Sequence, residues 1–265
     1  MQILYINLAR RADRRSFMAD QLQRLGLAAT RIEAATPADL GLGAGAARPP
    51  HVPRAVSPGD LACVASHERA WRAFLESADP YALVLEDDAL LSSRLPAFLA
   101  AFEALAPRAD MVRIESSGSG TRVKRVACRI EGIDLARPYG WEGGAAGYIV
   151  SRRAAGLLLD TPATRRKSLD EVLFDPFGPL AGELVRWQAL NGLVVQAHLS
   201  ARPDLIAFGS SDLRPIRWAS PKPMSRLERD ARRLATLWQR EIVAGSQRTF
   251  HQLLGAKKRA IPFLP

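Results

Sequence analysis

Three consecutive acidic residues, Glu86, Asp87 and Asp88, follow an apolar run at residues 81–85 that has the character of a buried strand. Ligands of α/β sheets collect outside the carboxyl ends of the strands, so these carboxylates are expected at a ligand-binding edge. Adjacent carboxylates repel one another. A divalent cation that prefers oxygen ligands, Mn²⁺ or Mg²⁺, would offset their charge and could bind a diphosphate. The alternative interpretation is an acidic turn after a strand, without a metal.

Cys63 and His67 are also spaced for chemistry, because residues four apart lie on the same face of a helix. No further ligand clusters with them in the sequence, so this pair does not predict a zinc site. His67 precedes Trp71 by one helical turn, and a histidine packed in the core is an equally good interpretation of it.

The elements that would position these residues begin with a strand at residues 2–8 and a helix that Asp13 caps and that ends before Gly26. Residues 41–58 carry glycine, proline and alanine without periodicity, which is typical of a loop. Ser57, followed by Pro58 and Asp60, then has the pattern of a capped helix start, and this helix would carry Cys63 and His67.

Further elements are expected at residues 97–105 (helix), 111–115 and 193–199 (strands) and 122–130 (an edge strand). Residues 141–151 combine a glycine-rich approach with a short strand and with Ser151, which is placed to cap a helix. The sequence contains neither G-x-G-x-x-G nor G-x-x-x-x-G-K-[ST], which argues against dinucleotide-binding and P-loop enzymes. The alternation of strands and helices predicts an α/β fold.

Size and composition indicate a globular protein of the reducing cytoplasm. The chain has 265 residues, of which 48% are hydrophobic, so it can bury a substantial core. Cys63 and Cys128 are far apart and indicate no disulfide framework. No stretch reaches the roughly 20 apolar residues of a spanning helix, and the apolar start lacks preceding basic residues, so neither an anchor nor a signal peptide is expected.

Positive charge is concentrated near the C-terminus. Residues 214–265 hold 12 Lys and Arg against three acids, whereas the net charge of the whole chain is +10. We therefore expect a neutral domain at 1–213 and a basic tail at 214–265, in which Ser225 and Glu228 begin an amphipathic helix. Such a tail suits attachment to an anionic inner membrane leaflet, although its apolar side could instead dock on the body.

An ordered set of short motifs resembles glycosyltransferase family 25, which contains bacterial lipooligosaccharide glycosyltransferases and related collagen galactosyltransferases. The motifs cover roughly residues 1–213 and are Ile6-Asn7-Leu8, Arg14-Arg15, Ser66-His67 with Trp71, Leu85-Glu86-Asp87-Asp88, Gly147-Tyr148 and Leu169-Asp170. Two stretches depart from the family pattern, Gly143-Gly144-Ala145-Ala146 and the approach Gly59-Asp60-Leu61-Ala62-Cys63 to Ser66. These departures bear on the choice of donor more than on the reaction.

The resemblance implies a GT-A type, Rossmann-like nucleotide-sugar fold, a UDP-sugar donor, a divalent metal and transfer with inversion of the anomeric centre. The residues that it places at the donor are Asn7, Leu8, Arg14, Ser66, His67, Glu86, Asp87 and Gly147. Asp88 is the first candidate metal ligand, and Glu86 or Asp87 would complete the site directly, through water or at the ribose. Arg14 could equally belong to a solvated helix start.

Inversion requires a carboxylate that takes the proton of the acceptor hydroxyl, and Asp170, with Glu171 as the second choice, is the candidate base. The alternative for Asp170 is to cap the short helix that follows it. The expected function is transfer of galactose or an N-acetylhexosamine to a glycan or lipid-linked acceptor. The competing hypotheses are an inactive scaffold and a protein that binds membrane or nucleic acid through its basic tail.

Overall fold

The computed structural model describes most of the chain outside residues 213–254. The described residues are 1–43, 46–49, 52–53, 56–105, 108–116, 118, 120–140, 143–161, 166–176, 178, 180–200, 202–209, 212 and 255–265. The amphipathic helix expected from Ser225 onwards and the aromatic Trp141 lie outside them. No helix within the described residues combines the length and the apolar character that crossing a membrane requires.

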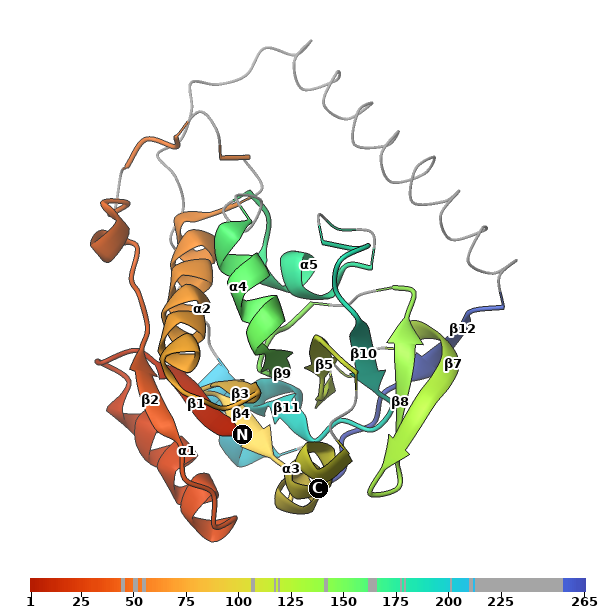
Figure 1. Ribbon diagram of the computed structural model, residues 1–265. Coiled ribbons are helices and arrows are strands. Elements are labelled where there is room, and N and C mark those ends of the chain that lie inside the picture. The colour runs from red at the N-terminus through yellow and green to blue at the C-terminus, as the bar shows by residue number, and fades with distance from the viewer. Residues whose placement is uncertain are drawn as a thin grey trace.

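A mixed nine-stranded sheet forms the centre of the molecule (Figure 1), in the order β12-β7-β8-β10-β5-β9-β3-β1-β2. Strands β1, β2 and β3 are parallel, and β9 is antiparallel to its neighbours β3 and β5. In chain order, the strands are β1 Gln2–Asn7, β2 Thr30–Glu33, β3 Tyr81–Glu86, β5 Met111–Arg113, β7 Gly120–Ile130, β8 Ile133–Pro138, β9 Gly147–Ser151, β10 Arg186–Ala189 and β12 Lys257–Ala260. The predicted α/β fold class is confirmed.

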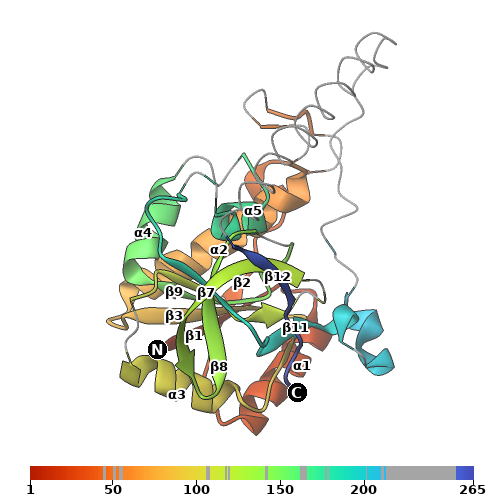
Figure 2. The same cartoon turned by 90° about the vertical axis from the view of Figure 1, so that its right-hand side faces the viewer.

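Helices cover both faces of this sheet, so the molecule has three layers (Figures 1 and 2). Helices α1 (Ala12–Arg24) and α3 (Leu95–Leu105) pack on one face, where Met18, Leu22 and Phe98 meet Leu83 and Leu85 of β3. Helices α2 (Pro58–Glu76), α4 (Arg152–Asp160) and α5 (Leu169–Phe174) pack on the other face. Because successive residues of β3 point to opposite faces, this apolar run is buried on both sides and ends where the acids begin.

Short elements complete the structure beside the carboxyl end of β3. A second sheet has the order β4-β11-β6, formed by Ala89–Leu91, Val194–Gln196 and Glu115–Ser116. Three short 3₁₀ helices are described, η1 Ala38–Leu40, η3 Ala197–Leu199 and η4 Pro203–Gly209. Helix η3, which carries His198, follows β11 and lies next to the acidic turn, because the Ala197 N–H donates to the Asp88 carbonyl at 2.8 Å.

Two of the predicted helix starts are confirmed by their hydrogen bonds. The hydroxyl of Ser57 accepts the backbone N–H of Asp60 at 3.1 Å, while the carboxylate of Asp60 accepts the backbone N–H of Ser57 at 2.7 Å. Ser151 caps α4 by accepting the N–H of Ala154 at 3.1 Å. The reciprocal pair at α2 and the single bond at α4 satisfy N–H groups that the first turn of a helix leaves unpaired, and they fix where these helices begin.

Three local predictions were wrong. Asp13 does not cap α1, because Arg11 occupies the cap position and the Asp13 carboxylate instead accepts from the Arg11 guanidinium at 2.9 Å. Strand β7 is not an edge strand, since β12 pairs with it in antiparallel register. The strand expected at 193–199 ends at Gln196 and continues as η3.

The last described residues belong to the body of the protein. Strand β12 adds to the sheet, Ile261 is buried beside Val123 and Ala136, and Phe263 forms a bridge with Gly192. A basic tail separate from the body is therefore an expectation only for the residues before Gly255. The domain boundary at 213/214 stays a prediction.

Candidate functional site

A cleft of about 240 Å³ opens at the edge of the sheet where β1 and β3 end. Its walls are the carboxyl ends of these strands, the first half of α2 and the segment that follows β11. The lining residues are Ile6, Leu8, Arg14, Ala34, Ser57, Gly59, Asp60, Cys63, Ser66, His67, Glu86, Asp87, Asp88, Gln196, His198 and Asp212. All three residues of the acidic motif therefore face the place where α/β sheets bind ligands.

The two aspartates of the motif have different surroundings. Both oxygens of Asp87 are engaged, one by the Asn7 amide at 2.7 Å and the other by the Arg14 guanidinium at 2.9 Å. Asp88 lies 3.6 Å from Arg14, and its buried Oδ1 accepts no hydrogen bond from the described residues. Asp87 thus anchors the turn after β3, while Asp88 keeps an oxygen for a ligand.

Burial, and after it the charge of neighbouring carboxylates, raises two pKa values in this cleft to about 7. For Glu86 the main cause is burial and the next is the charge of Asp87, whereas Arg14 acts in the opposite direction. For Asp88 burial again comes first and the charge of Glu86 second. A divalent cation would supply the missing positive charge, and the unpaired oxygen of Asp88 is the kind of hard ligand that Mn²⁺ and Mg²⁺ prefer. The residues present therefore fit the expected metal.

Asn7 and Ser66 are engaged within the protein. The amide oxygen of Asn7 accepts Arg31 Nε at 3.0 Å, and its nitrogen holds Asp87. The Ser66 hydroxyl donates to the Ala62 carbonyl at 2.7 Å and accepts the Ala35 N–H at 2.8 Å. In this arrangement both side chains position other parts of the cleft wall, and a direct contact with the donor stays a prediction.

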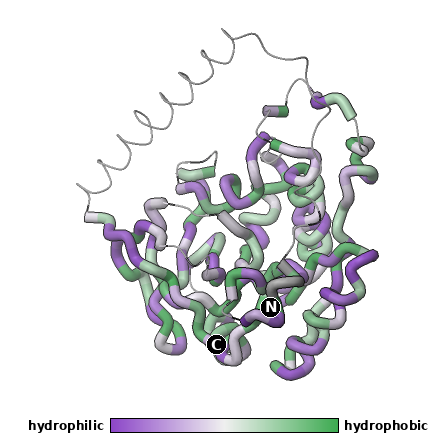
Figure 3. Tube along the Cα trace, turned by 180° about the vertical axis from the view of Figure 1, so that it is seen from behind, coloured by the Kyte–Doolittle hydropathy of each residue, from purple (hydrophilic) through white to green (hydrophobic). Residues whose placement is uncertain are grey.

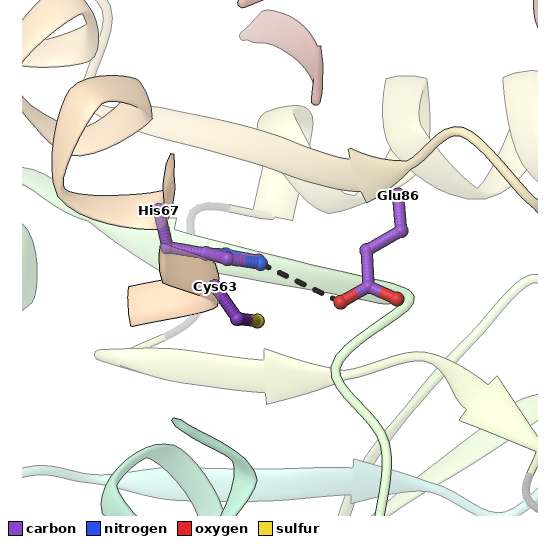
Figure 4. A group of neighbouring side chains, drawn as sticks. All are labelled: Cys63, His67 and Glu86. Atoms are coloured by element: carbon purple, nitrogen blue, oxygen red, sulfur yellow. Dashed lines mark ion pairs between the residues drawn. The ribbon is translucent and has the colours of Figure 1, made fainter. Parts of the chain in front are cut away.

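His67 is almost fully buried on α2, with 1% of its side chain exposed, and burial lowers its pKa to about 3, so the imidazole is neutral. Its Nδ1 lies 2.8 Å from the Tyr148 hydroxyl, and its Nε2 lies 3.6 Å from Glu86 Oε1. Cys63, one turn earlier on α2, completes a group in which the three potential ligand atoms all lie within 4.8 Å of one another (Figure 4). The expectation that no further ligand clusters with Cys63 and His67 was wrong, because β3 brings Glu86 to them.

The two candidate bases have different positions on α5. Asp170 Oδ2 accepts the Gly144 N–H at 3.2 Å, and its charge contributes to the raised pKa of Glu86, so it lies at the same edge of the sheet. Glu171 forms an ion pair with Lys167. Ser168, and not Asp170, occupies the N-cap position of α5. Asp170 is not among the residues that line the cleft, but it lies close enough to Glu86 to raise the pKa of that group, whereas the carboxylate of Glu171 is paired with Lys167.

The remaining predicted donor residues are divided between the cleft wall and the packing behind it. Leu8 and Arg14 line the cleft. Gly147 does not line it: it begins β9, and a Cβ atom there would lie 2.8 Å from the side chain of Val194. The glycine is required at this position by the close approach of β11.

Sequence reasoning assigned no role to Glu115, the next acid along this edge. Only 1% of it is exposed, and burial raises its pKa to about 7 against the opposing effect of Arg113. Its Oε2 accepts the Ala146 N–H at 3.1 Å, and its Oε1 accepts no hydrogen bond from the described residues. The available signal was an acid at the end of the strand expected at 111–115, as Glu86 is at the end of β3. His198, which follows the apolar strand β11, and Asp212 also line the cleft, and neither was assigned a role from the sequence.

Comparison with known proteins identifies the family. The sequence model of glycosyltransferase family 25, described as LPS biosynthesis protein, matches residues 1–173. The chain is 31% identical over 193 residues to the lacto-N-neotetraose biosynthesis glycosyltransferase LgtE of Neisseria gonorrhoeae, covering 67% of this chain and 68% of that protein. It is also 31% identical over 200 residues to the corresponding enzyme LgtB of Neisseria meningitidis serogroup B (strain ATCC BAA-335 / MC58), covering 67% and 69%.

Solved structures are more distant. A glycosyltransferase involved in glycosylation of the major capsid of PBCV-1 aligns with a TM-score of 0.43 and 9% identity, covering 78% of this chain and 97% of that one. The inositol-1-phosphate CTP transferase of T. maritima aligns with a TM-score of 0.35 and 10% identity, covering 77% and 71%. Membership follows from the sequence matches alone: the chain belongs to glycosyltransferase family 25, described by its role in LPS biosynthesis, and is a glycosyltransferase.

Proposed function

We propose that this glycosyltransferase moves a sugar from a UDP-sugar to a glycan acceptor, with a divalent cation and with inversion at the anomeric carbon. The observation that carries the proposal is the unpaired, buried Oδ1 of Asp88 beside Glu86 in the cleft at the carboxyl ends of β1 and β3. A family 25 enzyme needs a place for an anionic donor, and this is the edge at which an α/β sheet offers one.

Asp88 and Glu86 would hold Mn²⁺ or Mg²⁺, and Asp87 would keep the turn in place through Asn7 and Arg14. When bound, the cation supplies positive charge that stabilises the diphosphate as it leaves. Arg14, 6% exposed between the two aspartates, adds a fixed positive charge to the same wall. Leu8 would contribute an apolar surface next to the nucleotide.

Asp170 would take the proton of the acceptor hydroxyl during the displacement. Its carboxylate is oriented by the Gly144 N–H and lies at the same edge as Glu86. A carboxylate in this role accepts the proton as the new glycosidic bond forms on the face opposite the leaving diphosphate. Glu171, which pairs with Lys167, is the second candidate.

The transferred sugar would be galactose or an N-acetylhexosamine, and the acceptor a lipooligosaccharide or another surface glycan. The names of the two Neisseria relatives refer to lacto-N-neotetraose biosynthesis, which supports a glycan acceptor. If the acceptor is lipid-linked, the enzyme would work in the cytoplasm at the inner face of the inner membrane, where exposed basic residues such as Lys257 and Lys258 would meet anionic lipid.

Calorimetric titration of UDP with and without Mn²⁺ tests the donor site. We expect Mn²⁺-dependent binding to the wild type and to the control Asp20→Ala, which changes an exposed acid on α1, and loss of this binding in Asp88→Ala. Equal binding with and without Mn²⁺, or full Mn²⁺-dependent binding by folded Asp88→Ala, would contradict the proposed role of Asp88.

A further inference from the structure

We propose that Cys63, His67 and Glu86 form a site for Zn²⁺ or a metal of similar ligand preference. This site shares Glu86 with the oxygen-ligand site and differs from it in containing a thiolate and an imidazole. The sulfur, the His67 nitrogen and a Glu86 oxygen lie within 4.8 Å of one another.

The geometry of these side chains is close to that of a tetrahedral zinc site. With Zn–S of about 2.3 Å and Zn–N and Zn–O of about 2.0–2.2 Å, ligand atoms lie roughly 3.3–3.6 Å apart. His67 Nε2 and Glu86 Oε1 are 3.6 Å apart, which is already near this separation. Figure 4 shows His67 and Cys63 extending from the same face of α2 towards the carboxylate at the end of β3. The other separations are within 4.8 Å, so the side chains would have to move closer together around a bound ion.

A second group orients the imidazole as a metal ligand requires. The Tyr148 hydroxyl lies 2.8 Å from His67 Nδ1 and also accepts the indole N–H of Trp71 at 2.9 Å. When Nδ1–H donates to this oxygen, the lone pair of Nε2 faces Glu86. Metal-bound histidines commonly donate their other N–H in this way, which fixes both tautomer and ring orientation.

The ligand types indicate which metal is favoured. Thiolate and imidazole suit Zn²⁺, whereas Mn²⁺ and Mg²⁺ prefer oxygen ligands only. Three protein ligands leave the fourth position of a tetrahedral ion open towards the cleft, as in zinc sites that bind water or substrate. The two sites share Glu86, whose oxygen nearest His67 would bind the zinc. Asp88 belongs to the oxygen-ligand site alone.

Cobalt(II) is a direct probe, because a thiolate bound to Co²⁺ gives a near-ultraviolet charge-transfer band and a four-coordinate ion gives intense visible bands. We expect the metal-free full-length protein to show both on addition of one equivalent of Co²⁺, and Zn²⁺ to bleach them. Cys63→Ser should lose the charge-transfer band. The matched control Cys128→Ser, at the other free cysteine, should keep it. Absence of the band in the wild type, or a band that disappears only in Cys128→Ser, would overturn the proposal.

X-ray absorption at the zinc edge tests the same site without any substitution. The wild-type protein with one equivalent of Zn²⁺ should show one sulfur at about 2.3 Å in addition to nitrogen and oxygen ligands. A first shell without sulfur would exclude Cys63 as a ligand. This measurement covers the case in which Cys63→Ser does not fold.

One variant tests the zinc site and the proposed donor site independently of each other. Asp88→Asn should keep the thiolate band with Co²⁺ while losing Mn²⁺-dependent UDP binding. A band that is lost in Asp88→Asn would mean that both metals use one site and would contradict the assignment to Cys63, His67 and Glu86.

Discussion

Neighbouring residues of the acidic motif have different partners. Asp87 is neutralised by Arg14 and held by Asn7, so its removal would release the turn after β3 and leave Arg14 buried without this partner. Asp88 keeps an oxygen without a partner among the described residues, and an oxygen of Glu86 faces His67. One carboxylate therefore supports the turn, and the two beside it are available to ligands.

Asp170→Asn should lower the rate of transfer by about 10²–10⁴-fold, because the amide cannot accept the proton of the acceptor hydroxyl. The hydrogen bond from Gly144 N–H can persist to the amide oxygen, so Mn²⁺-dependent affinity for UDP should change little. The measurement is steady-state UDP release with donor and acceptor, beside calorimetry of UDP alone. Glu171→Gln is the matched comparison on the same helix and should stay close to wild type. If Glu171→Gln loses the activity and Asp170→Asn keeps it, the two roles are reversed.

Glu115 should make the free energy of unfolding fall as the pH rises. Its pKa is about 7 in the folded protein against an ordinary value of 4.5, so between these values the folded state binds more protons than the unfolded state. This contribution is fully present below about pH 4.5 and is lost as the pH rises through about 7. Glu115→Gln removes it while the amide oxygen can still accept the Ala146 N–H.

Melting temperatures at about pH 5 and about pH 8 test this sign. Relative to Glu115→Gln, the wild type should lose a few degrees more on going to the higher pH. The control Glu76→Gln changes an exposed glutamate and should show no such difference. A uniform destabilisation of Glu115→Gln at both pH values would instead mean that Glu115 and Arg113 form an ionised buried pair throughout.

At the scale of elements, Gly147 sets the distance between the large and the small sheet. A Cβ atom at this position would lie 2.8 Å from the Val194 side chain, so Gly147→Ala should destabilise the protein by about 1–3 kcal/mol through overpacking. Val194→Ala removes two of the three obstructing atoms, Cγ1 and Cγ2, and keeps Cβ, so the double variant should recover part of the stability that the sum of the single changes predicts to be lost. Urea unfolding of the four proteins measures this coupling. Unchanged stability with a loss of UDP affinity would instead support direct contact of Gly147 with the donor.

The helix starts and the first strands were predictable because the signals are local. The Ser57–Asp60 capping box and the apolar run before Glu86 each lie within a few residues, and one rule of helix or strand chemistry interprets each of them. The Asp13 prediction also used a local signal but was wrong. The guanidinium of a nearby arginine binds the Asp13 carboxylate in place of the helix N–H groups.

Long-range pairings were not predictable from the sequence. Strand β12 pairs with β7 across more than a hundred residues, and nothing in Lys257–Ala260 has the alternation of a strand. The group of Cys63, His67 and Glu86 joins the middle of a helix to the end of a strand that follows it. The first contact depends on strand register, and the second depends on how α2 packs on the sheet. Neither exists until the sheet has formed.

At the scale of the whole molecule, β12, β7 and β8 form a basic edge at the opposite end of the sheet from β2 (Figure 1). All four residues of β12 are exposed, and Lys258 stands directly opposite Arg122 in the register. Lys124 and Arg137 both lie against the Tyr139 ring, at 5.6 and 5.8 Å from its centroid. The chain along this edge, at the left of Figure 3, passes through several hydrophilic segments. Like charges opposite one another destabilise a pair of strands, so contact with an anionic surface would reduce the repulsion at this edge.

We therefore expect the protein to bind vesicles that contain phosphatidylglycerol and not vesicles of phosphatidylcholine alone, with binding that weakens as salt is added. Each basic residue near an anionic surface contributes about 1 kcal/mol, so reversing Lys124, Arg137 and Lys258 to Glu should weaken binding at least tenfold in a sedimentation assay. The matched control reverses Arg15, Arg24 and Arg108, which are exposed elsewhere, and changes the net charge equally. Equal loss in both variants would indicate attraction by net charge alone. Binding unchanged by the first set would show that this edge does not meet the lipid. Selective loss in the first variant would identify this edge as the surface that meets the lipid, because only an oriented contact depends on where the charges stand.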